Sequence, residues 1–106
     1  MTLSPKTFAH GTLLADTNSW LLAGDHVVAL DVAAVDPFDP MLEHESISVV
    51  GRMGFPPSAP TVSKLIVEKL ASHNAIRRRA HELFISGQKG SAIDHWVSAE
   101  RELLTP

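Results

Sequence analysis

The chain has 106 residues, of which 44% are hydrophobic and 20% charged, a composition typical of one globular domain and unlike a disordered tail, a collagen-like chain or a coiled coil. It contains no cysteine, which excludes disulfides, iron-sulfur clusters and a thiolate nucleophile and removes the main ligand of structural zinc sites. No apolar run is long enough for a spanning helix, and residues 1–6 lack the apolar core of a secretory signal. We expect a cytoplasmic protein.

The formal net charge of −3 is unevenly distributed along the chain. Residues 1–60 carry two basic and seven acidic side chains, whereas residues 61–106 carry seven basic and five acidic ones. The composition changes at the same place, because two glycines and three prolines fall within residues 51–60. We therefore expect an acidic, strand-rich segment over 1–50, a Pro/Gly linker over 51–60 and a helical segment over 61–106.

The first half of the chain shows strand signals. Residues 12–16 and 46–50 are strand candidates, and between them two apolar runs, 20–23 and 26–32, are joined by Gly24-Asp25. This pattern predicts a tight hairpin in which the glycine takes a positive φ. Residues 36–40 hold two prolines and read as a turn-rich loop. We expect an antiparallel sheet of three or four strands with exposed edges and one uncovered face.

After residue 60 the apolar spacing becomes helical. A first helix is predicted from Val62, Leu65, Ile66 and Leu70, and a second from Ile76, Ala80, Leu83 and Phe84, ending at Gly87 as a left-handed cap. A third begins at Ser91, which forms a capping-box pattern with Asp94. The first two helices are either separate, with Asn74 as an N-cap, or one kinked helix. The predicted fold class is α+β, a small antiparallel strand-rich segment followed by a helical hairpin or three-helix segment.

Residues 76–103 resemble a known family. Their ordered pattern of Ala80, Gly87, Trp96 and the pair Ala99-Glu100 is similar to the bacterial domain of unknown function 2934, although the loop after Gly87 is shorter and lacks the usual proline. The resemblance implies a helix-turn-helix hairpin of unknown role and transfers no chemistry. Residue size alone supports the same hairpin, since Ala80 permits close approach of a facing helix and Phe84 and Trp96 are expected to pack together in its core.

Metal and catalytic sites are not indicated. The six histidines include no pair at i, i+4 on a predicted helix, and Glu43-His44-Glu45 lies in a loop where neighbouring side chains diverge, so we expect neither a metal nor a cofactor. On a strand, His26 and Asp31 point to opposite faces. No nucleotide-binding glycine loop or serine elbow is present. We therefore expect that the protein is not an enzyme.

The candidate binding residues are Phe55, Arg77, Arg78 and Arg79. Phe55 lies in an apolar Gly-Phe-Pro-Pro stretch that could dock in extended form on another protein. The arginines allow three interpretations: a solvated face with an Arg78–Glu82 ion pair, contact with an acidic protein surface, or contact with phosphates. We expect a protein–protein interaction or accessory subunit of a larger bacterial assembly. The alternative is a DNA-associated regulatory protein that uses the Arg77–Arg79 helix. The oligomeric state is left open.

Overall fold

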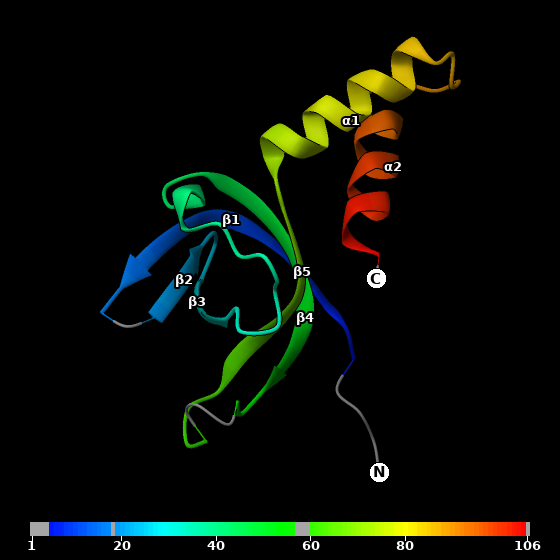
Figure 1. Ribbon diagram of the computed structural model, residues 1–106. Helices are drawn as coiled ribbons and strands as arrows, with labels where there is room; N and C mark the ends of the chain where they lie inside the picture. Colours follow the sequence, from blue (N-terminus) through cyan, green and yellow to red (C-terminus); the bar gives the residue numbers. More distant parts are fainter. Residues whose placement is uncertain (1–4, 18, 57–59, 106) are drawn as a thin grey trace.

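The computed structural model describes residues 5–17, 19–56 and 60–105. It places five strands and a short 3-10 turn before two helices (Figure 1). In chain order these are β1 (Thr7–Asp16), β2 (Ser19–Ala23), β3 (Val27–Asp31), the turn η1 (Pro40–Leu42), β4 (Ser46–Gly54), β5 (Lys64–Ser72), α1 (His73–Ile85) and α2 (Ala92–Leu104). The α+β class is confirmed at this level.

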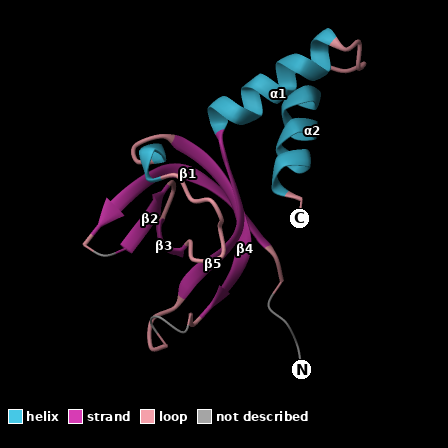
Figure 2. Cartoon of the chain, in the orientation of Figure 1, coloured by secondary structure: helices cyan, strands magenta, loops and turns pink. Residues whose placement is uncertain are grey.

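The strands close into a barrel in the order β1-β2-β3-β5-β4 (Figure 2). Neighbouring strands are antiparallel except β3 and β5, which pair in parallel. The long β1 pairs with β4 through residues 7–12 and with β2 through residues 12–16, so it belongs to both sides of the barrel. This arrangement is the five-stranded Greek-key topology of the OB fold.

The expected open sheet of three or four strands is wrong, because residues 64–72 supply a fifth strand. β5 pairs with β4 along its whole length and with β3 at Leu30↔Leu65 and Asp31↔Ile66. The pairing of β5 with β3 closes the sheet into a barrel, and closure removes exposed strand edges. The closed barrel does not have the uncovered sheet face that we expected, so this feature does not indicate a partner.

The helix predicted from Val62 to Leu70 is also wrong, because residues 64–72 form β5, and a bulge explains how Leu70 comes to the same face as Leu65. Val50 pairs with Lys69 while the next residue, Gly51, pairs with Val67, so Glu68 is an extra residue in β5. Inward-facing Leu65 and Val67 are therefore followed by Leu70 rather than by position 69. The bulge therefore accounts for Leu70 in the predicted stripe, whereas Val62 precedes the strand and Ile66 is not in the barrel core.

The boundaries around this strand differ from those expected. The linker predicted over 51–60 begins inside β4, whose last residue is Gly54, and residues 57–59 lie outside the described residues. Both predicted starts of the second helix, an N-cap at Asn74 and one kinked helix, are wrong. β5 leads directly into α1, and Ser72 is the N-cap. The expected Ser91–Asp94 capping box and the left-handed Gly87, at φ 89°, are confirmed.

The predicted hairpin at Gly24-Asp25 is confirmed, but the positive φ predicted for Gly24 is wrong. β2 and β3 pair up to Ala23↔Val27, and the Gly24 N–H donates to the His26 carbonyl at 3.1 Å. Gly24 does not have a positive φ. A Cβ there would lie 2.8 Å from the His10 carbonyl oxygen, so glycine is required by the close approach of β1.

Two apolar cores lie on opposite faces of β4. Ile47 and Val49 point into the barrel, and Val50 points outward to a second core beneath the helices. Ala80 and Trp96 border this second core as expected. Phe84 does not belong to it, because its side chain is 65% exposed. The barrel core comprises Leu13, Leu22, Leu30, Ile47, Val49, Leu65 and Val67, and the second core Val50, Ala71, Ile76, Leu83, Ala99 and Leu104.

The bulge predicts the effect of adding a methyl group to Gly51. A Cβ there would stand 2.2 Å from the Ile66 carbonyl oxygen, so Gly51→Ala must force β4 and β5 apart. We expect a loss of about 3 kcal/mol in unfolding free energy, measured by denaturant titration. Gly54→Ala is the matched control, since its Cβ meets only the side-chain tip of Ile66 at 3.2 Å. Equal stabilities of the two variants would contradict this account.

Candidate functional site

Phe55 and the arginines lie at opposite ends of the molecule. Phe55 follows β4 at the β4–β5 turn, at the foot of Figure 1, and is 64% exposed. Met53 and Val62 are exposed near it, on either side of the same turn. The arginines belong to α1, at the top of the view. The structure therefore does not bring the predicted binding residues together into one site.

The three arginines have different environments. Arg79 binds Glu102 of α2 and Glu82 of its own helix, each at 3.0 Å, and these hydrogen bonds, Glu102 foremost, raise the pKa of Arg79. The expected Arg78–Glu82 pair is wrong, since Glu82 lies beside Arg79. Arg77 donates to the Asn74 side chain at 3.2 Å, and Arg78 is exposed. Arg77 and Arg78 are thus the cations available to a partner.

A polar cluster that the sequence did not predict joins the barrel to both helices. Ser48 lies on the outward face of β4 and is only 2% exposed. Its hydroxyl donates to Glu100 Oε2 of α2 at 2.9 Å and lies 3.1 Å from Nε2 of His73, the first residue of α1. His10 of β1 is directly opposite Ser48 in the sheet register. Four elements therefore meet at one buried hydroxyl.

The hydrogen bonds indicate which ring nitrogen of His73 carries a proton. Because the single Ser48 hydroxyl proton goes to Glu100, the Nε2–H of a neutral His73 must donate to the Ser48 oxygen. The pKa of His73 is lowered below 6.5 by burial, then by the nearby His10 and Arg77, against the opposing effect of Glu100. A neutral His73 is the form that the cluster favours.

The cluster is not arranged for nucleophilic catalysis. In a serine triad the histidine lies between the serine and the acid and takes the serine proton. Here Ser48 lies between the histidine and the acid, and only 2% of its surface is exposed to solvent. The contacts instead hold α1 and α2 against β4. A serine within the apolar run 47–50 is the one sequence signal of a buried hydroxyl, but it does not identify His73 and Glu100 as the partners of Ser48.

A groove runs between the two helices and has a volume of about 370 Å³. Its apolar walls come from Phe84 of α1 and Trp96 of α2, and Arg77 stands at its rim. The Trp96 ring also packs edge-on against His73, with centroids 5.3 Å apart. His95 is 4% exposed and fixes the interhelical loop, because its Nε2 lies 2.8 Å from the Gln88 carbonyl oxygen. The remaining lining residues are Ala80, His81, Gly90, Ala92 and His95.

Other kinds of site are not evident. Over residues 5–17, 19–56 and 60–105, no three histidine or acidic side chains are grouped so that they could hold a metal ion. No helix in this part of the chain has the length and apolar character needed to span a membrane. No known protein family, curated protein or solved structure matches the chain.

The role of Ser48 can be measured directly. Ser48→Ala removes one oxygen atom and with it both hydrogen bonds, to His73 and to Glu100. We expect the unfolding free energy to fall by about 1–3 kcal/mol, because two part-buried polar groups lose their partner. Ser98→Ala, at a hydroxyl whose contact with Gln88 is 3.4 Å long, should stay within about 0.5 kcal/mol of the parent. Similar unfolding free energies for the two variants would show that the Ser48 cluster does not stabilise the packing of the helices on β4.

The lowered pKa of His73 predicts a loss of stability on acidification. Above its ordinary value of 6.5 the imidazole is neutral in the folded and unfolded chain, so its contribution to stability is complete. As the pH falls below 6.5, the unfolded chain takes up the proton first, and the unfolding free energy decreases. His73→Gln cannot titrate but retains an N–H donor, so its slope between about pH 5 and 7 should be smaller. An unchanged slope would contradict the assignment.

Proposed function

We propose that the protein is a non-enzymatic interaction module, an accessory subunit of a larger bacterial assembly in the cytoplasm, and that it binds another protein through α1 and α2. The observation that supports this most directly is the exposure of large apolar side chains around the turn between the helices. Phe84 is 65%, Ile85 69% and Ile93 75% exposed. Apolar side chains gathered on one surface are typical of protein-binding sites.

The groove indicates what such a partner would offer. Phe84 and Trp96 provide apolar and aromatic walls, and tryptophan and arginine are the residues most often found at the energetic centre of interfaces. Arg77 at the rim favours a carboxylate beside the inserted group. The expected partner segment therefore carries an apolar side chain next to an acidic one.

The assignment as a non-enzyme rests on the residues of the polar cluster. Ser48 has a histidine and an acid beside it, and its order of hydrogen bonds is unsuited to activation of the hydroxyl. The resemblance of residues 76–103 to the domain of unknown function 2934 remains a prediction. The positions of α1 and α2, on either side of Gly87 and Gly90, are compatible with that family's helical hairpin.

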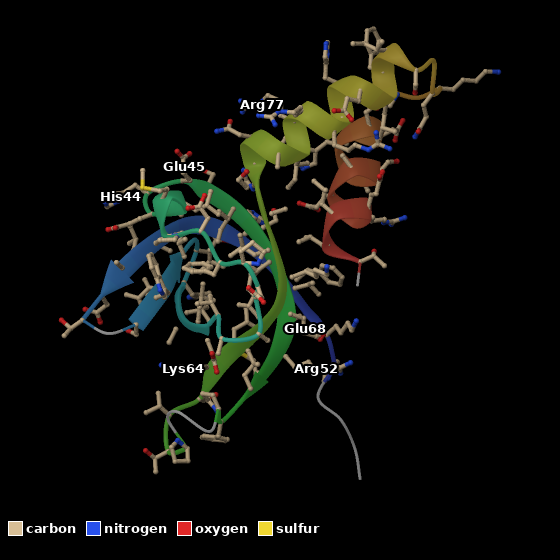
Figure 3. All side chains as sticks on the ribbon, in the orientation of Figure 1. His44, Glu45, Arg52, Lys64, Glu68 and Arg77 are labelled. Carbon is tan, nitrogen blue, oxygen red and sulfur yellow. The ribbon has the colours of Figure 1, made fainter. Side chains whose placement is uncertain are left out.

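Phe55 belongs to a second apolar surface that we include in the proposal. Met53, Phe55 and Val62 are 42%, 64% and 47% exposed at the β4–β5 turn. Arg52 and Lys64 come from the strands that flank it (Figure 3). A multi-protein assembly could contact the chain here and at the helices at the same time, since the two surfaces are at opposite ends.

The alternative is DNA binding through the α1 arginines. Arg77 and Arg78 are exposed, as contact with phosphates requires. Charge disfavours the barrel as a binding surface, because residues 7–51, which include all of β1, β2 and β3, contain no lysine or arginine. Any nucleic-acid contact would therefore depend on the helices alone, so protein binding is the function that we favour.

Crosslinking from defined positions tests the proposal. A photoreactive residue at position 84, in a C-terminally tagged chain expressed in its own cells, should yield one major protein adduct. The same residue at Lys69, an exposed position of β5, is the matched control and should yield none. Phe84→Ser should reduce co-purification of that protein at least about tenfold, as expected when an apolar anchor is lost.

A second measurement separates the alternative. Binding of a labelled DNA duplex should be undetectable at moderate salt if the helices bind protein. Affinity that falls steeply with salt, with a slope reduced by up to about two units in Arg77→Gln/Arg78→Gln, would support DNA binding instead. Arg79 is left unchanged because it holds α2 through Glu102.

A further inference from the structure

The chain segment before β4 forms an acidic corner, defined here as the exposed Met41, the half-buried Glu43 and the exposed Glu45. Met41 is 83% exposed, and Glu43 and Glu45 are the charged side chains on either side of His44. Backbone hydrogen bonds hold the corner to β1: the His44 N–H donates to the Leu13 carbonyl at 2.6 Å, and the Leu13 N–H donates to the Glu45 carbonyl at 3.0 Å. Its acidic groups are therefore presented on fixed backbone.

The backbone of the corner carries a further sign of constraint. His44 has a φ of 71°, a left-handed conformation that residues other than glycine seldom adopt. Such conformations persist where surrounding contacts impose them and are concentrated at functional positions. The corner thus has a fixed shape, and little ordering would be needed when it binds.

The basic start of α1 adjoins this corner. In the β4–β5 ladder Ile47 pairs with Ser72, so the residues that precede β4 lie beside the residues that begin α1. Figure 3 shows Arg77 at the base of α1, on the same side of the molecule as His44 and Glu45. Arg78 is the next residue of that helix turn and is exposed. Acidic and basic groups therefore occupy neighbouring parts of one face.

These opposite charges do not neutralise one another within the chain. Among the residues that the structure describes, Glu43 pairs with His44 at 3.3 Å, and Arg77 donates to Asn74. No ion pair in the described ranges joins Glu43 or Glu45 to Arg77 or Arg78. Both sets of charges thus remain available to another molecule.

We propose that this face binds a second copy of the chain in a two-fold symmetric dimer, in which Arg77 and Arg78 of each copy face Glu43 and Glu45 of the other. A two-fold axis presents the same patch on both subunits, so a patch that carries both signs side by side is complementary to itself. A partner with a single sign of charge would gain on one half of the face and be repelled by the other half.

The chemistry of the face suits such a contact. Met41 supplies an unbranched apolar side chain beside the charges, and methionine adapts readily to a facing surface. The Phe84 wall of the groove lies farther along α1, whereas Arg77 lines that groove and also belongs to this face. The dimer therefore goes beyond the proposed function but shares Arg77 with it.

Charge exchange between two variants tests the dimer. Sedimentation equilibrium of the full chain at low salt should give twice the 11.5 kDa mass of the monomer, and added salt should weaken the association. Arg77→Glu/Arg78→Glu should sediment as a monomer, because its face carries only negative charge. Glu43→Lys/Glu45→Lys should do the same with only positive charge. An equal mixture of the two variants should restore the dimer, since each face then meets its opposite.

A control variant and two contrary results make the dimer proposal testable. Lys64→Glu/Lys89→Glu makes the same change in net charge as the arginine variant and should remain dimeric. Lys64 lies at the far end of the β4–β5 ladder, opposite Gly54, and Lys89 lies in the loop between the helices. Restored dimerisation in the mixture also shows that both variants are folded. A parent chain that is monomeric at low salt, or two reversed variants that remain dimeric alone, would overturn the proposal. Phe84→Ser should leave the dimer intact, so loss of the crosslinked partner and loss of the dimer are independent results.

Discussion

Strand β4 is buried on both of its faces, and the rest of the structure depends on this arrangement. Its inward side chains, Ile47 and Val49, complete the barrel core, whereas Ser48 and Val50 lie under the helices. The barrel therefore supplies the surface on which α1 and α2 pack. A short apolar strand serves two cores at once, and the buried Ser48 hydroxyl specifies where the helices sit on it. Apolar contacts alone do not have this directional character.

The parts of the fold that could be predicted were those determined by neighbouring residues. The Ser91–Asp94 capping box and the Gly87 cap are set within a few positions, and both are present. The Gly24 hairpin is present too, although its glycine is required by the close approach of β1. β5 was missed because its spacing is altered by a bulge at Glu68, and because its pairing with β3 joins segments that are distant in the sequence. Local periodicity contains neither kind of information.

The candidate site shows the same division. The exposure of Arg77, Arg78 and Phe55 could be anticipated from their residue types and surroundings. The pairing of Arg79 with Glu102 could not, since it depends on how α2 crosses α1. Nor could the meeting of Ser48, His73 and Glu100, which come from three separate elements. Two features of the surface depend on the fold. Exposed apolar side chains gather at the turn between the helices, and opposite charges lie near one another where β4 and α1 begin.

The direct passage from β5 into α1 has a consequence for how this chain can change. Ser72 is both the last residue of the strand and the N-cap of the helix, so no loop separates the two elements. Inserting or deleting one residue near this junction would rotate the whole of α1 by about 100°. Such a change would turn Phe84 and the arginines toward other directions while the barrel stayed closed. The length of β5 therefore sets the orientation of the helical surface, and substitutions can alter its chemistry far more freely than insertions or deletions can.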